Sequence, residues 1–209
     1  EWFLKGVCAN KNIKSKILMT TRHAPRAIKP RGEFMHGCRE VELTAMQKED
    51  VVEFFHKQGI QGNRAEIEAM CEPYGRHPLS LRILVGLIQD DRETPGDIVV
   101  ASKLDITNDI IANKHHVLEV SFSTLSTEQQ KLLGNIACFR SQMKYAELKI
   151  ISSVPLRKRS KARNNSTEKL AGNLKVLENR GLLQWNRKTN KYDLHPIVRR
   201  FAYGRLTDV

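Results

Sequence analysis

Apolar side chains recur at helical spacing along the first half of this chain. We expect a first helix to begin at Thr44, with Gln47 completing a capping box three residues later. Its buried stripe is made of three apolar side chains, Val51, Phe54 and Phe55. A second helix is expected over residues 64–71. The next helix, over residues 79–88, is apolar on nearly all sides, so it should be the core of a helical subdomain.

A second series of elements begins at Val117. Ser126 and Gln129 form another capping box, and the helix that they start has an apolar face made of Leu132, Leu133, Ile136 and Ala137. A short helix is expected over residues 145–151. Residues 156–163 read LRKRSKAR and predict a basic loop.

The last elements are a helix, a hairpin and a helix. The first of these helices is lined by three leucines, Leu170, Leu174 and Leu177, and Gly181 should end it in the left-handed conformation. Residues 182–194 run through a basic turn and back, which predicts a two-stranded wing. Pro196 then opens the final helix, because proline is favoured at the first helical position. Three helices followed by such a wing form a winged-helix arrangement.

Residues 15–22, SKILMTTR, have a different pattern. Their continuous apolar core predicts a strand buried on both faces, as in a parallel sheet. Residues 23–40 are rich in proline, glycine and charge and predict an exposed loop, and the acidic residues 90–108, with Pro95-Gly96, predict a domain boundary or an exposed connector. The predicted fold class is therefore mainly α with small β. We divide the chain into the end of an α/β domain (1–40), a helical subdomain (41–108) and a winged-helix subdomain (109–209).

Composition narrows the class of protein. No apolar run approaches the ~20 residues of a membrane span, so we expect no membrane partner. Four scattered cysteines, Cys8, Cys38, Cys71 and Cys138, have the spacing of neither a zinc site nor a disulfide framework. Free buried thiols and a cytoplasmic location are expected. Because the chain starts at Glu1 without a signal region, we also expect it to be a piece of a longer protein.

Charge is distributed unevenly along the chain. Residues 1–139 hold 18 Lys and Arg against 18 Asp and Glu, whereas residues 140–209 hold 17 against 5, so the second part supplies the whole net charge of +12. A basic segment of this kind is typical of nucleic-acid binding, although basic runs are often only solvated faces. The asymmetry indicates two modules with different partners.

Three short segments carry candidate chemistry, and the first follows the expected strand. Ligands of open α/β sheets bind beyond the carboxyl ends of strands, where Thr20, Thr21 and Arg22 fall. The threonine hydroxyls and the planar guanidinium suit phosphate oxygens. The alternative is that Arg22 is an ordinary solvated charge.

The other two segments lie at helix starts. A glycine turn leads into Pro78 and Leu79, and the flat proline ring suits packing against a base or a sugar; a plain loop-to-helix junction is the alternative. His195 comes directly before Pro196, where free N–H groups and the positive end of the helix dipole gather. That position suits a phosphate, and the alternative is that His195 is an N-terminal helix cap or a half-buried structural residue.

In this order and spacing, the segments resemble motifs of the NB-ARC family of STAND nucleotide-binding switches. KILMTTR (16–22) is similar to the sensor strand of their nucleotide-binding fold, CEPYGRHPLSL (71–81) to their Gly-Leu-Pro-Leu motif, and KYDLHPIVRRFA (191–202) to their Met-His-Asp motif. The stretches VLEVSFSTLSTEQQKLLGNIACF and LKVLENRGLLQW add to the resemblance, which covers nearly the whole chain.

The resemblance implies an adenine nucleotide, ADP or ATP, as the ligand. Arg22, next to Thr20 and Thr21, would sense the terminal phosphate. Pro78, with Leu79, would pack near adenine and ribose. His195 would hold the β-phosphate of ADP and lock the winged helix against the P-loop NTPase fold.

This chain also departs from the family pattern. The glycine-rich phosphate loop and the acidic strand that holds magnesium are expected upstream, so Mg²⁺ would be held only by residues outside this chain. Arg76 and His77 replace the usual Gly-Leu, Leu194 replaces methionine, and Pro196 stands where many members carry aspartate. The last change removes one polar partner of the histidine.

The function expected from the resemblance is that of a regulatory switch. ADP would hold it closed, and nucleotide exchange would open it for signalling. An upstream effector, a downstream repeat sensor and homo-oligomerisation on activation are implied partners. The alternative is a winged-helix regulator that binds nucleic acid through residues 140–209. No spacing indicates a metal site or a nucleophile–base pair, so we assign no catalytic residue and expect this chain alone to be inactive as an ATPase.

Overall fold

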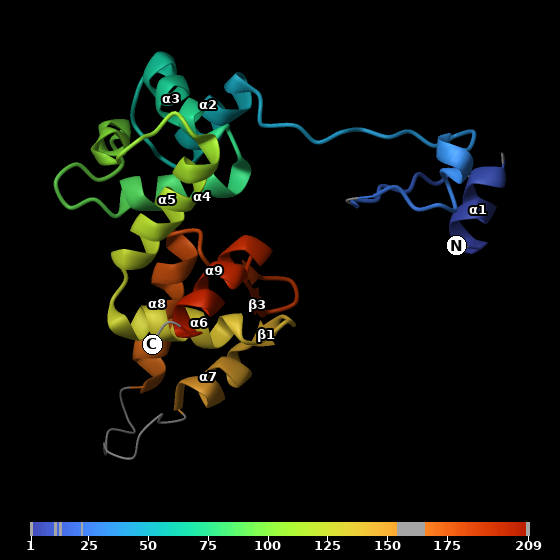
Figure 1. Ribbon diagram of the computed structural model, residues 1–209. Helices are drawn as coiled ribbons and strands as arrows, with labels where there is room; N and C mark the ends of the chain where they lie inside the picture. Colours follow the sequence, from blue (N-terminus) through green and yellow to red (C-terminus); the bar gives the residue numbers. More distant parts are fainter. Residues whose placement is uncertain (1, 11, 13, 22, 154–165, 208–209) are drawn as a thin grey trace. The chain divides into compact units, whose positions relative to one another are not determined.

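The structure is a computed structural model of the 209-residue chain, and it describes all residues except 1, 11, 13, 22, 154–165 and 208–209. The chain divides into two compact units, Glu1–Thr44 and Ala45–Val209, which we call unit 1 and unit 2 (Figure 1). The described residues are mainly helical, with one small antiparallel sheet, as the sequence predicts.

Unit 1 contains helix α1 (Trp2–Ala9) and the short 3-10 helix η1 (Pro30–Gly32). The Sγ atoms of Cys8 and Cys38 lie 3.0 Å apart, and both residues are half-buried. Cys138 is exposed, so of the four cysteines Cys71 alone matches the expectation of a buried thiol.

The strand predicted over residues 15–22 is wrong for the described part of this segment. Residues 15–21 form no strand, and the side chains of Ile17, Leu18 and Met19 are exposed, Leu18 to 96%. A parallel strand needs hydrogen-bonded neighbours and a cover on both faces. The described residues of unit 1 supply neither, so the apolar run has nothing against which to pack.

The first part of unit 2 is helical. It contains α2 (Lys48–Lys57), α3 (Arg64–Cys71), η2 (Glu72–Tyr74), α4 (Pro78–Gln89) and η3 (Ile98–Lys103). The bounds of α3 confirm the prediction, and Asn63 caps it through a capping box with Glu66. Helix α2 begins four residues later than expected, with Gln47 as the N-cap residue. The acidic side chains of its first turn, Glu49 and Asp50, favour that start because they face the positive end of the helix dipole.

The second part of unit 2 contains five helices and three short strands among its described residues. They are α5 (Ile110–Ser123), α6 (Thr127–Ala137), β1 (Met143–Lys144), α7 (Tyr145–Ser153), α8 (Ser166–Asn179), β2 (Gln184–Asn186), β3 (Lys191–Asp193) and α9 (Pro196–Thr207). The Ser126–Gln129 capping box and the left-handed Gly181 are confirmed. The sheet is antiparallel in the order β1-β3-β2. The predicted basic loop, 156–163, lies outside the described residues.

Helix α4 belongs to the core of unit 2 and is buried on most sides, as its sequence predicts. Gly86 permits its contact with the end of α8, because a Cβ on Gly86 would lie 2.6 Å from Arg180 Cα. On the other side of this contact, Gly181 has a φ of +69°, and a Cβ there would lie 2.7 Å from Arg82 Cγ. The backbones of α4 and of residues 180–181 thus meet at two glycines, Gly86 and Gly181, which place no side chain between them.

The Arg180 side chain ties three elements together at the same place. It is 9% exposed and forms an ion pair with Asp90, the C-cap residue of α4. Its Nη1 atom donates to Ser121 O at 3.3 Å and to Thr124 Oγ1 at 2.5 Å, both at the end of α5. A buried cation that loses such a partner is strongly destabilising, so these contacts favour one arrangement of α4, α5 and α8.

We expect Gly86→Ala to destabilise the protein by about 1–3 kcal/mol, because the added methyl group overlaps the Arg180 backbone. Gly172→Ala is the matched control. Gly172 lies on the exposed side of α8 with nothing within 4 Å of its would-be Cβ, so alanine there should stabilise the helix by about 0.5–1 kcal/mol. Urea unfolding measures both changes. A Gly86→Ala variant as stable as the parent chain would contradict this packing.

Candidate functional site

Two helices of unit 2 begin in the same way, with a histidine followed by a proline. His77 is the N-cap residue of α4 and Pro78 is its first residue. His195 directly precedes Pro196, the first residue of α9. Each histidine therefore lies beside the unpaired N–H groups and the positive dipole end of a helix longer than two turns.

His195 is half-buried, and its backbone and ring both belong to the first turn of α9. Its Nδ1 atom accepts a hydrogen bond from Ile197 N at 3.3 Å, and its carbonyl oxygen accepts one from Arg199 N at 2.9 Å. The capping role foreseen as an alternative is thus confirmed. Because Nδ1 accepts, the neutral ring carries its proton on Nε2, which leaves that atom as a donor. Burial lowers the pKa of His195 and favours this neutral form.

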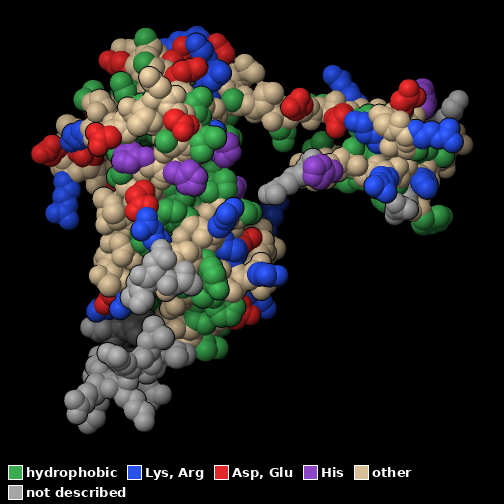
Figure 2. Space-filling model, viewed as in Figure 1, with side chains coloured by type: hydrophobic (Ala, Val, Ile, Leu, Met, Phe, Trp, Pro, Cys, Tyr) green, Lys and Arg blue, Asp and Glu red, His purple; other side chains and the backbone are tan. Residues whose placement is uncertain are grey.

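His77 lies in the same neighbourhood. Burial lowers its pKa first, and the charges of Lys114 and His195 lower it further, so these three side chains are close enough to interact electrostatically. Figure 2 shows histidine side chains gathered across the middle of the visible face of unit 2. Lys114 in α5 and His195 before α9 both act electrostatically on His77 before α4, and we call these three side chains the histidine–lysine cluster (His77, Lys114 and His195).

The turn that leads into α4 holds polar atoms that lack partners. Gly75 and Arg76 both have left-handed backbones, with φ of +61° and +49°. Three buried side-chain atoms of this segment, Tyr74 Oη, Arg76 Nε and His77 Nδ1, have no hydrogen-bond partner among the described residues. Arg76 Nε forms an ion pair with Glu72 Oε2 at 3.6 Å, a distance too long for a hydrogen bond. Buried polar groups are normally paired, so three such atoms in four residues indicate a place where a ligand can supply partners.

Asn113 fixes the position of Lys114. Its side chain is buried and makes four hydrogen bonds, which join α5 to η2 and to the preceding loop. Its Nδ2 atom donates to Pro73 O at 3.0 Å and to Thr107 O at 2.7 Å. Its Oδ1 atom accepts from Thr107 N at 2.9 Å and Thr107 Oγ1 at 3.1 Å. Lys114 Nζ consequently lies beside the turn, 3.4 Å from the position that a Cβ on Gly75 would take.

The residues proposed from the sequence are distributed over both units. Thr20 and Thr21 lie in unit 1 and are exposed, and Thr21 Oγ1 donates to the carbonyl oxygen of His23 at 2.7 Å. Arg22 lies outside the described residues. In unit 2, Pro78 is exposed beside His77, whereas Leu79 is buried in the core and can only support a ligand from behind. Pro78 and His195 are the two that the structure associates with the histidine–lysine cluster.

Sequence reasoning missed His77 and Lys114. It treated His77 as a departure from a motif, although the pair His-Pro occurs twice in the chain, at 77–78 and 195–196, and both times opens a helix. That repeat was the available signal. Lys114 has no local signal, because its position depends on contacts between α5 and the turn before α4.

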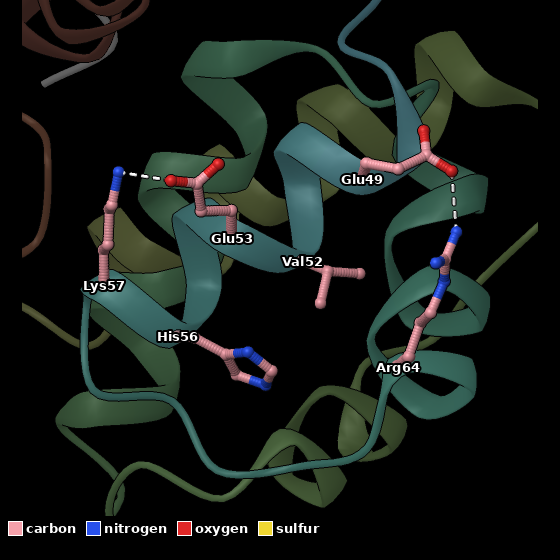
Figure 3. A pocket seen from close by; sticks show the side chains of 6 residues that line it. All are labelled: Glu49, Val52, Glu53, His56, Lys57 and Arg64. Atoms are coloured by element: carbon pink, nitrogen blue, oxygen red, sulfur yellow. Dashed lines mark hydrogen bonds and ion pairs between the residues drawn. The ribbon is translucent and has the colours of Figure 1, made fainter.

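A hollow outside this cluster lies over α2 and the start of α3 (Figure 3). Its charged side chains pair with one another: Glu53 with Lys57, and Glu49 with Arg64. Hydrogen bonds from Lys57 lower the pKa of Glu53, which keeps that carboxylate ionised and paired. Such surface pairs leave little charge for a ligand, so this hollow is the weaker candidate for an anion site.

Neither a metal-binding cluster nor a membrane-spanning helix occurs in the part of the chain that the structure describes. No group of three histidine, cysteine or acidic side chains there could hold a metal ion. None of the described helices is long and apolar enough to cross a membrane. Comparison with models of known protein families and with curated proteins gives no match for this chain.

We expect the free energy of unfolding to fall as the pH is lowered from about 7.5 to about 5.5. Both histidines have a folded pKa below the ordinary 6.5, so the unfolded chain binds more protons in this range. His77→Gln should reduce this pH dependence, whereas His115→Gln, which removes an exposed histidine of α5, should not. Urea unfolding at a series of pH values measures the effect. An equal pH dependence in both variants would contradict the burial of His77.

Proposed function

We propose that unit 2 binds the phosphate groups of an adenine nucleotide, as part of a switch of the NB-ARC type. In such a switch, residues 1–40 would form the end of a P-loop NTPase fold, residues 41–108 a helical subdomain and residues 109–209 a winged-helix subdomain. The observation that carries it is the histidine–lysine cluster, which contains His195 and, in His77, the residue directly before Pro78.

The chemistry of the cluster fits a phosphate. Neutral His195 offers Nε2–H as a donor, since its Nδ1 atom is occupied by the backbone of α9. Lys114 supplies positive charge at the turn, and Arg76, whose Nε atom is ion-paired with Glu72 but makes no hydrogen bond, is a further cation. The positive dipole ends of α4 and α9 add to this field. An anion would therefore meet donors from three segments of the chain.

The exposed ring of Pro78 fits the other half of a nucleotide. It lies at the first position of α4, where it gives up no backbone donor. Its outer face is free of the core, whereas Leu79 beneath it is buried. A base or a ribose can pack on this face while the phosphates reach the adjacent histidines.

The switch follows from differential affinity. A ligand shifts a two-state equilibrium only by binding one state better than the other. ADP bound by residues from both α4 and α9 favours the state in which these helices lie together. Loss of that contact favours the open state. In the open state the effector and the repeat sensor would act, and the protein would form homo-oligomers. Thr20, Thr21 and Arg22 remain proposed contacts of the terminal phosphate, and Mg²⁺ would be held by residues outside this chain.

The test is calorimetric titration of the chain with ADP and with pyrophosphate. His195→Ala and Lys114→Gln should each weaken binding about tenfold or more, because hydrogen bonds to charged groups contribute about 1.5–3 kcal/mol. His195→Gln should retain more affinity than His195→Ala, since its amide keeps an N–H donor. In a longer chain with a phosphate loop, His195→Ala should also speed ADP release and raise basal signalling.

The control variants remove one histidine and one lysine from exposed helix positions outside the histidine–lysine cluster. They are His115→Ala in α5 and Lys131→Gln in α6. ADP binding that is lowered equally by control and site variants, or unchanged by His195→Ala in a folded chain, would contradict the proposed role of the cluster.

A further inference from the structure

The hairpin of β2 and β3 presents a half-exposed tryptophan on a stacked pair of rings. Trp185 is 40% exposed and faces Tyr192 across the two strands. The ring centroids are 6.0 Å apart and the ring planes are inclined by only 11°. Tyr192 is buried, so it forms the base of the stack, and the indole extends the stack toward solvent.

Hydrogen bonds hold the indole and the turn in place. Trp185 Nε1 donates to Asn190 Oδ1 at 3.1 Å, and Asn190 has the left-handed backbone that the turn requires. At the other side of the turn, Asn186 Oδ1 accepts from Lys188 N at 3.0 Å and from Thr189 N at 3.2 Å. A planar side chain is thus fixed in orientation before any ligand arrives, which lowers the entropy cost of stacking against it.

Positive charge surrounds this stack. The Arg187 guanidinium lies over the indole, 5.6 Å from the ring centroid. Arg82, Lys175 and Arg187 all act electrostatically on Glu178, which in turn acts on Tyr192, so one carboxylate stands among three cations beside the rings. On the adjacent rung of the sheet, Lys191 pairs with Lys144 of β1, and because successive side chains of a strand alternate between faces, these two lysines lie on the opposite face from the rings.

We propose that this hairpin is a binding site for single-stranded nucleic acid, in which a base stacks at Trp185 while Arg187 and Lys188 contact backbone phosphates. Aromatic platforms flanked by cations bind single strands in this way without reading sequence. Arg187 has a long side chain, so its guanidinium can leave the ring for a phosphate when a base arrives. This function is additional to the nucleotide site and uses none of its residues.

The geometry favours a single strand over other polyanions. A paired duplex hides the faces of its bases, so it could use only the charges of the hairpin. An acidic peptide would likewise use the charges and leave the indole without a partner. Stacking on Trp185 is therefore the property that distinguishes the proposed ligand.

The test uses the Trp2→Phe variant, in which Trp185 is the one remaining tryptophan. Titration with a short single-stranded oligodeoxythymidine should quench its fluorescence, and the affinity should fall steeply with salt. With a fluorescently labelled oligonucleotide, Trp185→Ala should weaken binding about tenfold, and Trp185→Phe should keep most of it. Tyr203→Ala, which removes another exposed aromatic side chain, is the matched control and should bind as the parent chain does.

Three results would overturn the proposal. The first is binding of the oligonucleotide without quenching of Trp185 fluorescence. The second is an equal affinity for a duplex, which Trp185→Ala leaves unchanged. The third is competition by polyglutamate that equals competition by the unlabelled oligonucleotide. The first two would reduce the hairpin to a general polyanion surface, and the third would indicate an acidic protein partner. Excess ADP should not displace the oligonucleotide, because the two proposed sites share no residue. Loss of oligonucleotide binding and loss of ADP binding can therefore be detected separately.

Discussion

The contact between the backbones of α4 and residues 180–181 is the constraint on which unit 2 depends. Gly86 and Gly181 allow the two segments to meet without side chains between them, and Arg180 then pairs with Asp90 at the end of α4. Helix α4 is therefore fixed at one end against α8. Because a helix is stiff, its other end, with His77 and Pro78, is fixed as well.

The same constraint explains how distant residues form one site. Asn113 joins α5 to the turn before α4, which brings Lys114 to that turn. The hairpin that follows α8 leads directly into α9, whose first turn holds His195. The cluster thus depends on packing in unit 2, and a shift of α4 relative to α9 would separate its members. That property is what a nucleotide-dependent switch requires of its ligand contacts.

Local features of the fold were predictable because their physics is local. Residues 64–71 have the helical period and a capping asparagine before them, and Gly181 had to follow a helix with a left-handed turn. The apolar run at 17–19 was misjudged because burial of a strand depends on neighbours that its own sequence does not specify. For the site, His195 could be identified from a helix start, whereas Lys114 depends on the tertiary contacts of Asn113.

The central claim is that His77 and His195 bind one anion together, and a double-mutant cycle tests it most directly. The affinity for pyrophosphate would be measured by calorimetry for the parent chain, His77→Ala, His195→Ala and the double variant. We expect the two substitutions to be non-additive, with a coupling free energy of about 0.5 kcal/mol or more. Additive losses, or no loss from His77→Ala, would show that the two histidines act separately and would contradict the account.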